Sequence, residues 1–147
     1  MIEDRALHTS RTLRFSPKEV YKTFESADLL ASWWGPEDFT NTFEVFEFTP
    51  GGRWEFVMHG PDGSNYPNKS IFNELVPDTK IVIHHDCPPN FILTIELTPV
   101  TEGTHLSWAQ VFDDVQTAQA VKLRAGSANE QNIDRLTYVL KEVAGAA

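Results

Sequence analysis

Residues 83–88, with the sequence IHHDCP, contain the side chains best suited to chemistry: two histidines, an aspartate and a cysteine in a row. These side chains are common ligands of zinc and other transition metals. Neighbouring residues on a strand point to opposite faces, so His84 and His85 cannot readily bind one ion together. No second Cys/His cluster in the sequence completes a tetrahedral site. We therefore expect neither a metal site nor a cofactor.

His85 alternates with Ile81 and Ile83, which places it on an apolar, inward face of the expected strand. A buried imidazole beside a ligand could serve as a hydrogen-bond partner or as a general base. The alternative, which we favour, is a structural histidine bonded to a backbone carbonyl. Cys87 precedes two prolines at a turn without the basic surroundings that activate a thiol, so a nucleophilic role is not expected.

Two other polar residues interrupt apolar rows. Gln110 alternates with Trp108, and burying its amide without a partner would cost about 1–3 kcal/mol, so we expect a protein, water or ligand partner. Glu74 alternates with Phe72 and poses the same question, unless its face meets solvent. The pattern leaves open which face of residues 66–76 is inward.

Several common functions have no support in the sequence. No serine elbow, glycine-rich nucleotide fingerprint or zinc-protease helix occurs, which removes the commonest enzyme classes. The GPDGSN stretch at 60–65 resembles a hairpin turn rather than a phosphate or calcium loop. The net charge of −9 argues against nucleic-acid and anionic-membrane partners, which require clustered Lys and Arg.

The overall composition indicates one globular domain over residues 1–147. The chain is 41% hydrophobic and holds ten Phe, four Trp and three Tyr, which suits a large core or a lined cavity. It has no long apolar run and no signal-peptide pattern at its start, so a cytoplasmic protein is expected. The single cysteine excludes an internal disulfide and fits a reducing compartment.

The sheet that positions the candidate site residues is expected to be mostly antiparallel. Residues 5–15 alternate like a strand, and residues 39–112 contain six further strand-like runs. The stretches between the runs are short and rich in Gly, Pro, Asp and Asn, which indicates neighbouring antiparallel strands.

Helices are expected at both ends of this sheet sequence. Ser16, Pro17 and Glu19 form a helix start with a capping box. A second short helix from about residue 26 ends at Gly35-Pro36. Near the C-terminus, apolar residues spaced like one face of a long helix over residues 129–143 are Ile133, Leu136, Leu140 and Val143. Residues 114–128 are expected to form a loop or a short helix.

The order of elements and several motifs resemble one known family, the proteins similar to the activator of the ninety-kilodalton heat-shock protein's ATPase. The resemblance rests on LLASWWGPEDFT and FTPGGRWEFVMHGPDG, with SPKEVYKTF before them and YPNKSIFNELVPDTKIV, GTHLSW and NIDRLTYVL behind. It covers nearly the whole chain. The family belongs to the START-like (SRPBCC) helix-grip superfamily.

The resemblance implies an α+β fold: a seven-stranded antiparallel sheet curled around a long C-terminal helix, with a cavity between them. Two short helices would close one end. Adjacent helical residues lie roughly 100° apart, so Trp33 and Trp34 cannot share one narrow buried stripe. The resemblance implies that one indole anchors the short helix and the other faces the cavity mouth; the alternative is that both only pack in the core.

Three functions remain open. The favoured one is a cytosolic protein that binds a small hydrophobic or amphipathic molecule in the cavity. The second is a cyclase- or hydrolase-type enzyme of the same superfamily, with His85 as its candidate catalytic residue, acting with Glu74 or Gln110. The third is an interaction module like the co-chaperone that names the family, although nothing here corresponds to that protein's additional N-terminal domain.

The expected ligand-binding residues are those on the presumed inward faces: Trp33, Trp34, Trp54, Phe56, Met58, Phe72, Glu74, His85, Phe91, Leu93, Trp108 and Gln110. A homodimer is a further expectation, because the edge strands of a sheet that does not close need protection.

Overall fold

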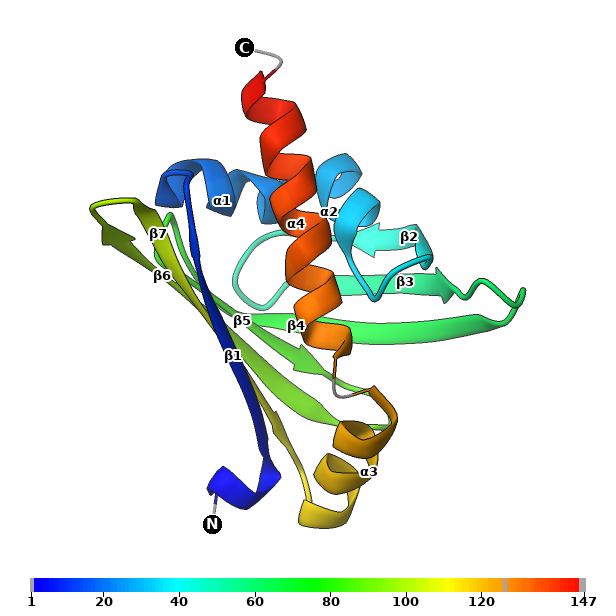
Figure 1. Cartoon of the computed structure of the whole chain (residues 1–147). Coiled ribbons are helices and arrows are strands. Elements are labelled where there is room, and N and C mark those ends of the chain that lie inside the picture. The colour runs from blue at the N-terminus through cyan, green and yellow to red at the C-terminus, as the bar shows by residue number, and fades with distance from the viewer. Residues whose placement is uncertain (1, 126, 146–147) are drawn as a thin grey trace.

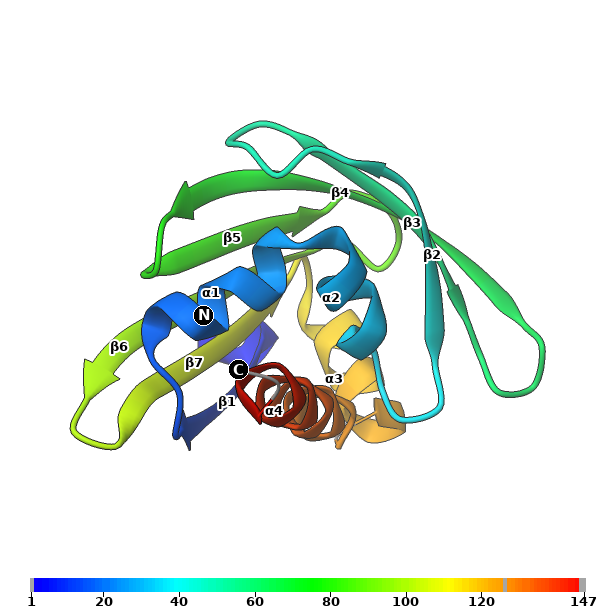
Figure 2. The same cartoon turned by 90° about the horizontal axis from the view of Figure 1, so that it is seen from above.

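The computed structural model describes residues 2–125 and 127–145 and contains one curled sheet with helices on its concave side (Figures 1 and 2). In chain order its elements are η1 (Ile2–Arg5), β1 (Ala6–Leu13), α1 (Pro17–Glu25), α2 (Ala27–Trp33), β2 (Thr40–Phe46), β3 (Arg53–His59), β4 (Asn65–Val76), β5 (Lys80–His85), β6 (Phe91–Val100), β7 (Gly103–Phe112), α3 (Val115–Ala125) and α4 (Ala128–Gly145).

The seven strands follow the order β1-β7-β6-β5-β4-β3-β2, and every neighbouring pair is antiparallel. The sheet is thus a meander from β2 to β7, with β1 added beside β7 and with β1 and β2 at the edges. Viewed from above, it arches around α4, while α1 and α2 lie across one end (Figure 2). The α+β helix-grip arrangement expected from the sequence is confirmed.

The two short helices begin where the sequence indicates. The Ser16 hydroxyl accepts from the Glu19 N–H, and the Glu19 carboxylate accepts from the Ser16 N–H, so the expected capping box is present. Ser26 then ends α1 and begins α2, because its N–H donates to the Lys22 carbonyl and its hydroxyl accepts from the Leu29 N–H. One residue therefore turns the chain from the first helix into the second.

A bulge in β4 corrects the expected placement of Glu74. The pairing of β4 with β5 shifts between Phe72 and Glu74, so the inward face passes from Phe72 to Leu75 rather than to Glu74. Glu74 lies on the outside, with its side chain 49% exposed and its carboxylate 3.3 Å from Lys80 Nζ. A strict two-residue period puts Glu74 on the face of Phe72 because it cannot register the extra residue; of the two outcomes left open for Glu74, exposure to solvent is the one found.

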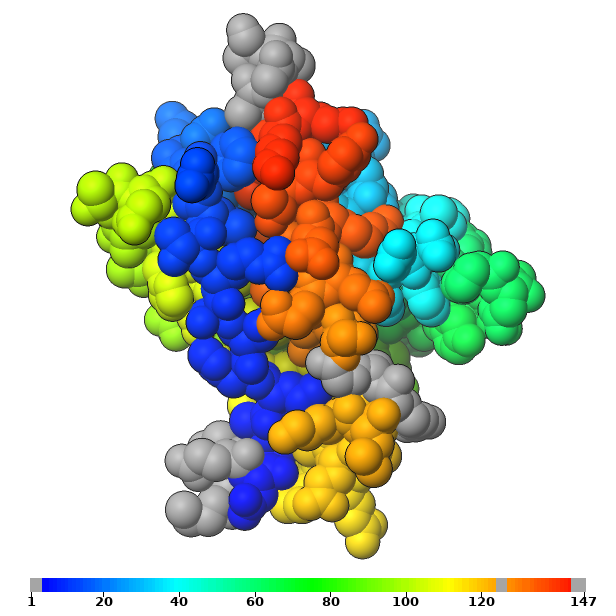
Figure 3. Space-filling model, viewed as in Figure 1, coloured from blue at the N-terminus to red at the C-terminus, as the bar shows by residue number. Residues whose placement is uncertain are grey.

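Helix α4 covers the open side of the sheet, between β1 on one flank and α2 and β2 on the other (Figure 3). Ile133, Leu136 and Leu140 are almost completely buried, as their spacing predicted. Val143 departs from that prediction: it is 42% exposed, because the last turns of α4 extend beyond the sheet (Figure 1). None of the helices in the described ranges is long and apolar enough to cross a membrane.

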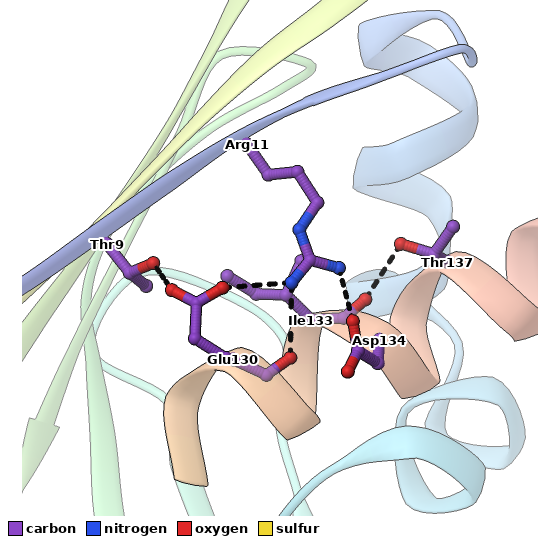
Figure 4. Close-up of polar contacts among 6 residues, drawn as sticks. All are labelled: Thr9, Arg11, Glu130, Ile133, Asp134 and Thr137. Carbon is purple, nitrogen blue, oxygen red and sulfur yellow. Dashed lines mark hydrogen bonds and ion pairs between the residues drawn. The ribbon is translucent and has the colours of Figure 1, made fainter. Parts of the chain in front are cut away.

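Charged groups join the edge strand β1 to α4 (Figure 4). Arg11 lies 2.9 Å from a carboxylate oxygen of Glu130 and 2.7 Å from one of Asp134, which are four residues apart on the helix. The hydroxyl of Thr9 donates to the other Glu130 oxygen. The inward face of β1 therefore meets the helix through polar groups at its middle and through the buried Leu13 at its end.

Three side chains of α4 hold the loop that follows α2. The Arg135 guanidinium donates to four carbonyl oxygens, those of Ser32, Trp34, Gly35 and Pro36, at 2.9–3.1 Å. Nearby, the Gly35 N–H donates to Asn132 Oδ1 and the Glu37 N–H to Gln131 Oε1. These bonds satisfy the open C-terminal end of α2 and fix the Trp-Trp-Gly-Pro turn to the long helix. We call this set the α4 clamp.

Residues 115–125 form the helix α3, one of the two outcomes expected there. Asp114 provides its N-terminal cap by accepting from the Thr117 N–H at 2.7 Å. The helix packs against η1 and the end of β7, at the opposite end of the sheet from α1 (Figure 1).

The burial of α4 can be tested with Leu136→Ala, which removes a fully buried side chain. The free energy of unfolding should fall by about 2–5 kcal/mol, because the truncation leaves a cavity in the core. Chemical denaturation measures this, with the exposed Lys141→Ala on the same helix as a control expected within about 0.5 kcal/mol of the parent. Equal effects of the two substitutions would place α4 outside the core.

The α4 clamp can be tested with Arg135→Met, which keeps the aliphatic stem but removes the donors. The loss of hydrogen bonds from a charged donor should destabilise the protein by about 2–3 kcal/mol. Amide hydrogen exchange should also accelerate at Gly35 and Glu37 by more than about tenfold, since their loop is released locally. Lys141→Met is the control; unchanged exchange at both amides in Arg135→Met would contradict the clamp.

Candidate functional site

A cavity of about 250 Å³ lies between the sheet and the first turns of α4. Strands β3 to β7 form one side, α4 the other, and the Trp34–Pro36 turn borders it. The lining residues are Trp34, Gly35, Pro36, Phe56, Met58, Asn68, Ser70, Ile83, His85, Pro89, Phe91, Leu93, Trp108, Gln110, Ala128, Asn129 and Asn132. Eight of these are among the residues that the sequence predicted for a ligand site: Trp34, Phe56, Met58, His85, Phe91, Leu93, Trp108 and Gln110.

The two adjacent tryptophans have different positions. Trp33 is fully buried in the core, and its Nε1–H donates to the Thr23 carbonyl at 3.1 Å, which ties α2 to α1. Trp34 follows the helix and borders the cavity, with its indole stacked on that of Trp108 at 5.7 Å between centroids. The structure thus places one indole as an anchor and the other beside the cavity, the arrangement that the resemblance implies.

All four tryptophans of the chain form one connected aromatic cluster. Trp54 contacts Trp34 edge-on at 5.0 Å but does not border the cavity itself. Phe72 lies behind Trp54, with the two rings stacked at 5.7 Å. Trp33, Trp54 and Phe72 therefore form the layer that supports the cavity wall, and Glu74 lies outside on the surface.

His85 forms part of the cavity wall and is held from several sides. Its Nδ1–H donates to the Pro89 carbonyl at 2.8 Å, the backbone bond that the structural interpretation expected. Its ring stacks on Phe91 at 4.4 Å, with an angle of 9° between the planes. Burial lowers the pKa of His85 below its ordinary value of 6.5, and the bond to Pro89 offsets only part of this effect.

The second ring nitrogen of His85 meets a side chain that the sequence did not suggest. His85 Nε2 lies 2.6 Å from the Asn68 carboxamide oxygen, while the amide nitrogen of Asn68 donates to the Tyr66 carbonyl. Because a carboxamide oxygen can only accept, this contact is a hydrogen bond only with a proton on Nε2. A neutral ring with its proton on Nδ1 would instead accept from the Asn68 amide nitrogen after a half-turn of that amide. That half-turn would bring the Asn68 oxygen to the Tyr66 carbonyl, so a neutral His85 that donates to Pro89 cannot keep both bonds of Asn68.

Gln110, which is half-buried, also has a partner. The Asn129 Nδ2–H donates to Gln110 Oε1 at 3.1 Å, across the gap between β7 and α4. Asn132, only 6% exposed, borders the same space one helical turn further along. The sequence offered a signal for Asn132 that was missed: it continues the buried row of Leu136 and Leu140 at four-residue spacing.

The groups around the cavity suit binding better than bond breaking. The described lining residues include one imidazole but no Asp, Glu, Lys or Arg that could act with it as an acid–base pair. Cys87 Sγ lies 3.5 Å from His85 Nε2 but does not line the cavity. Residues 2–125 and 127–145 contain no group of three or more His, Cys, Asp or Glu side chains that could hold a metal ion.

A larger groove of about 490 Å³ lies elsewhere, between α1 and the loops that follow β2 and β4. Its walls mix two lysines with acidic groups, among them Lys18, Lys22, Glu25 and Asp78. Because charged side chains at such an exposed place are usually solvated, we regard the cavity at α4 as the candidate site.

The burial of His85 predicts a specific pH dependence of stability. Because its pKa is lower in the folded than in the unfolded protein, the unfolded chain binds the proton more readily. This contribution to stability is therefore present above pH 6.5 and is lost as the pH falls below that value towards the folded pKa. Denaturant midpoints from pH 8 to 5 should fall less steeply in His85→Gln than in the parent; parallel curves would refute the assignment.

Residues 14–141 match the family model described as Activator of Hsp90 ATPase homolog 1-like protein. No curated protein matches the chain. A protein from Nitrosomonas europaea has a similar structure, with a TM-score of 0.87, 20% identity and 97% of each chain covered. An AHSA1-like protein from Aeromonas hydrophila is also similar, with a TM-score of 0.76, 18% identity and coverage of 97% of this chain and 95% of that one. Since the family model spans most of its length, the chain belongs to the family of Activator of Hsp90 ATPase homolog 1-like proteins.

Proposed function

We propose that this protein binds a small hydrophobic or amphipathic molecule in the cavity between the sheet and α4. The observation that carries the proposal is the composition of the cavity wall, where Trp34, Phe56, Phe91 and Trp108 surround a space of about 250 Å³. Ligand sites are concave and mostly apolar, with a few polar groups that fix orientation. The cavity is small by that standard, which favours a ligand well below drug size.

The support behind the wall favours a preformed site. The α4 clamp fixes the turn that carries Trp34, and the core residues Trp33, Trp54 and Phe72 pack behind the lining. A wall held in this way loses little conformational entropy when a ligand enters, so more of the burial energy remains as affinity.

Within this proposal, His85 is a wall residue that stacks on Phe91 and bonds to Pro89. Its Nδ1–H is bonded to the Pro89 carbonyl and its Nε2 lies against the Asn68 carboxamide, and the described lining residues offer no carboxylate or amine that could act with it. The proposal therefore assigns the site to binding and not to catalysis.

Naphthalene is a suitable neutral probe, and calorimetric titration measures its binding. We expect a Kd on the order of 10 μM, about −7 kcal/mol, which burial of a few hundred Å² of apolar surface can supply. Binding should also change the tryptophan fluorescence, because all four indoles belong to the cluster at the cavity. The absence of any heat or fluorescence change up to saturation of the probe would refute the proposal.

A substitution that fills the cavity locates the binding. Ala128 lines the space at the start of α4, so Ala128→Phe should weaken naphthalene binding by more than about tenfold while the thermal midpoint stays close to that of the parent. The matched control is Ser127→Phe, since the exposed Ser127 is adjacent to Ala128 but does not line the cavity. Equal binding by the two variants would place the probe elsewhere.

A further inference from the structure

The lining of the cavity differs in charge from the rest of the chain. The chain as a whole carries a net charge of −9, yet none of the described residues that line the cavity is an Asp, Glu, Lys or Arg. Burial lowers the pKa of His85, the titratable side chain in the wall, and so favours its neutral form. A charged ligand would lose its hydration there without meeting a counter-charge.

The neutral polar groups of the lining suit a ligand group that is polar but uncharged. Gln110 Oε1 and Asn129 Nδ2 bond to each other at 3.1 Å. A carboxamide also has a second side, so this pair retains the N–H donors of Gln110 and the Oδ1 acceptor of Asn129. Among the described residues, the structure gives no further partner to the Gln110 amide hydrogens or to Asn129 Oδ1.

A donor beside an acceptor matches a ligand group that also contains both, such as an amide or a lactam. Asn132 borders the same space, and its Oδ1 is already used by the Gly35 N–H in the α4 clamp. This leaves the amide hydrogens of Asn132 as a further donor on the α4 side.

The volume sets the size of the part of the ligand that can be buried. A designed apolar cavity of about 150 Å³ accommodates benzene. The cavity of this protein, about 250 Å³, has less than twice that volume. It therefore suits a ligand of roughly two fused rings with a small substituent.

We infer that the cavity takes an uncharged, flat compound of about two fused rings whose amide-like group bonds to Gln110 and Asn129. This inference rests on the proposed function and adds the chemical class of the ligand to it.

Four probes of nearly equal size test the inference: naphthalene, 2-naphthamide, 2-naphthoate and 2-naphthamidine. The last three share one planar shape, and at pH 7 they are neutral, anionic and cationic. Calorimetry on the unmodified protein should give the tightest binding for 2-naphthamide, with both ions weaker by at least about tenfold. The amide should also bind several-fold more tightly than naphthalene, because it satisfies the Gln110–Asn129 pair.

The outcomes separate this inference from the proposed function. If either ion binds as tightly as the amide, the uncharged class is wrong although the cavity still binds ligands. If the amide binds no better than naphthalene, the assignment of the Gln110–Asn129 pair is wrong. If none of the four probes binds, including naphthalene, the proposed function itself fails and this inference with it.

A variant isolates the hydrogen-bonding pair. Gln110→Leu should reduce the advantage of 2-naphthamide over naphthalene, as the ratio of the two Kd values on the same variant, to less than about twofold. The matched control is Gln116→Leu on the exposed surface of α3, which should leave the ratio unchanged. A full advantage retained in Gln110→Leu would overturn the assignment, and the four-probe comparison decides the charge class even if this variant fails to fold.

Discussion

The packing of α4 into the curl of the sheet is the constraint on which the rest of the structure depends. Its apolar row of Ile133, Leu136 and Leu140 closes the core, and its polar residues hold the neighbouring elements in place. Arg135 and Asn132 hold the turn after α2, while Glu130 and Asp134 hold the edge strand β1. One helix thus closes the core and also holds the edge strand β1 and the turn that borders the cavity.

The α4 clamp explains how the turn between α2 and β2 is held in place as part of the cavity wall. The helix α2 is short, with seven residues, and would be marginal alone because a helix of that length does not offset its nucleation cost. Four carbonyl oxygens at its C-terminal end and in the turn after it meet one guanidinium, whose fork of donors fits several acceptors at once. Trp34 consequently faces the cavity in a defined orientation and stacks on Trp108.

Charge is distributed unevenly, and this distribution shapes the proposed function. Most of the charged side chains lie on the surface, where Glu74 pairs with Lys80 and Arg11 with Glu130 and Asp134. The cavity wall contains aromatic rings together with neutral amides and one imidazole among its described residues. A site of this kind binds through apolar burial and orients its ligand through a few hydrogen bonds, which is why a small neutral compound suits it.

The sequence alone determined most of the element types, their order and most of the buried rows, because these depend on local periodicity, capping residues and turn residues. For residues 114–128 it left a loop and a short helix open. It also identified seven strand residues of the cavity wall, since alternation along a strand decides which side chains share a face, and the family resemblance added Trp34. Only the tertiary structure decided the rest. The bulge in β4 moved Glu74 outside, and the partners of His85 and Gln110, namely Asn68 and Asn129, come from segments distant in sequence. Such contacts depend on how strands and helix meet in space, which the period of a single segment does not encode.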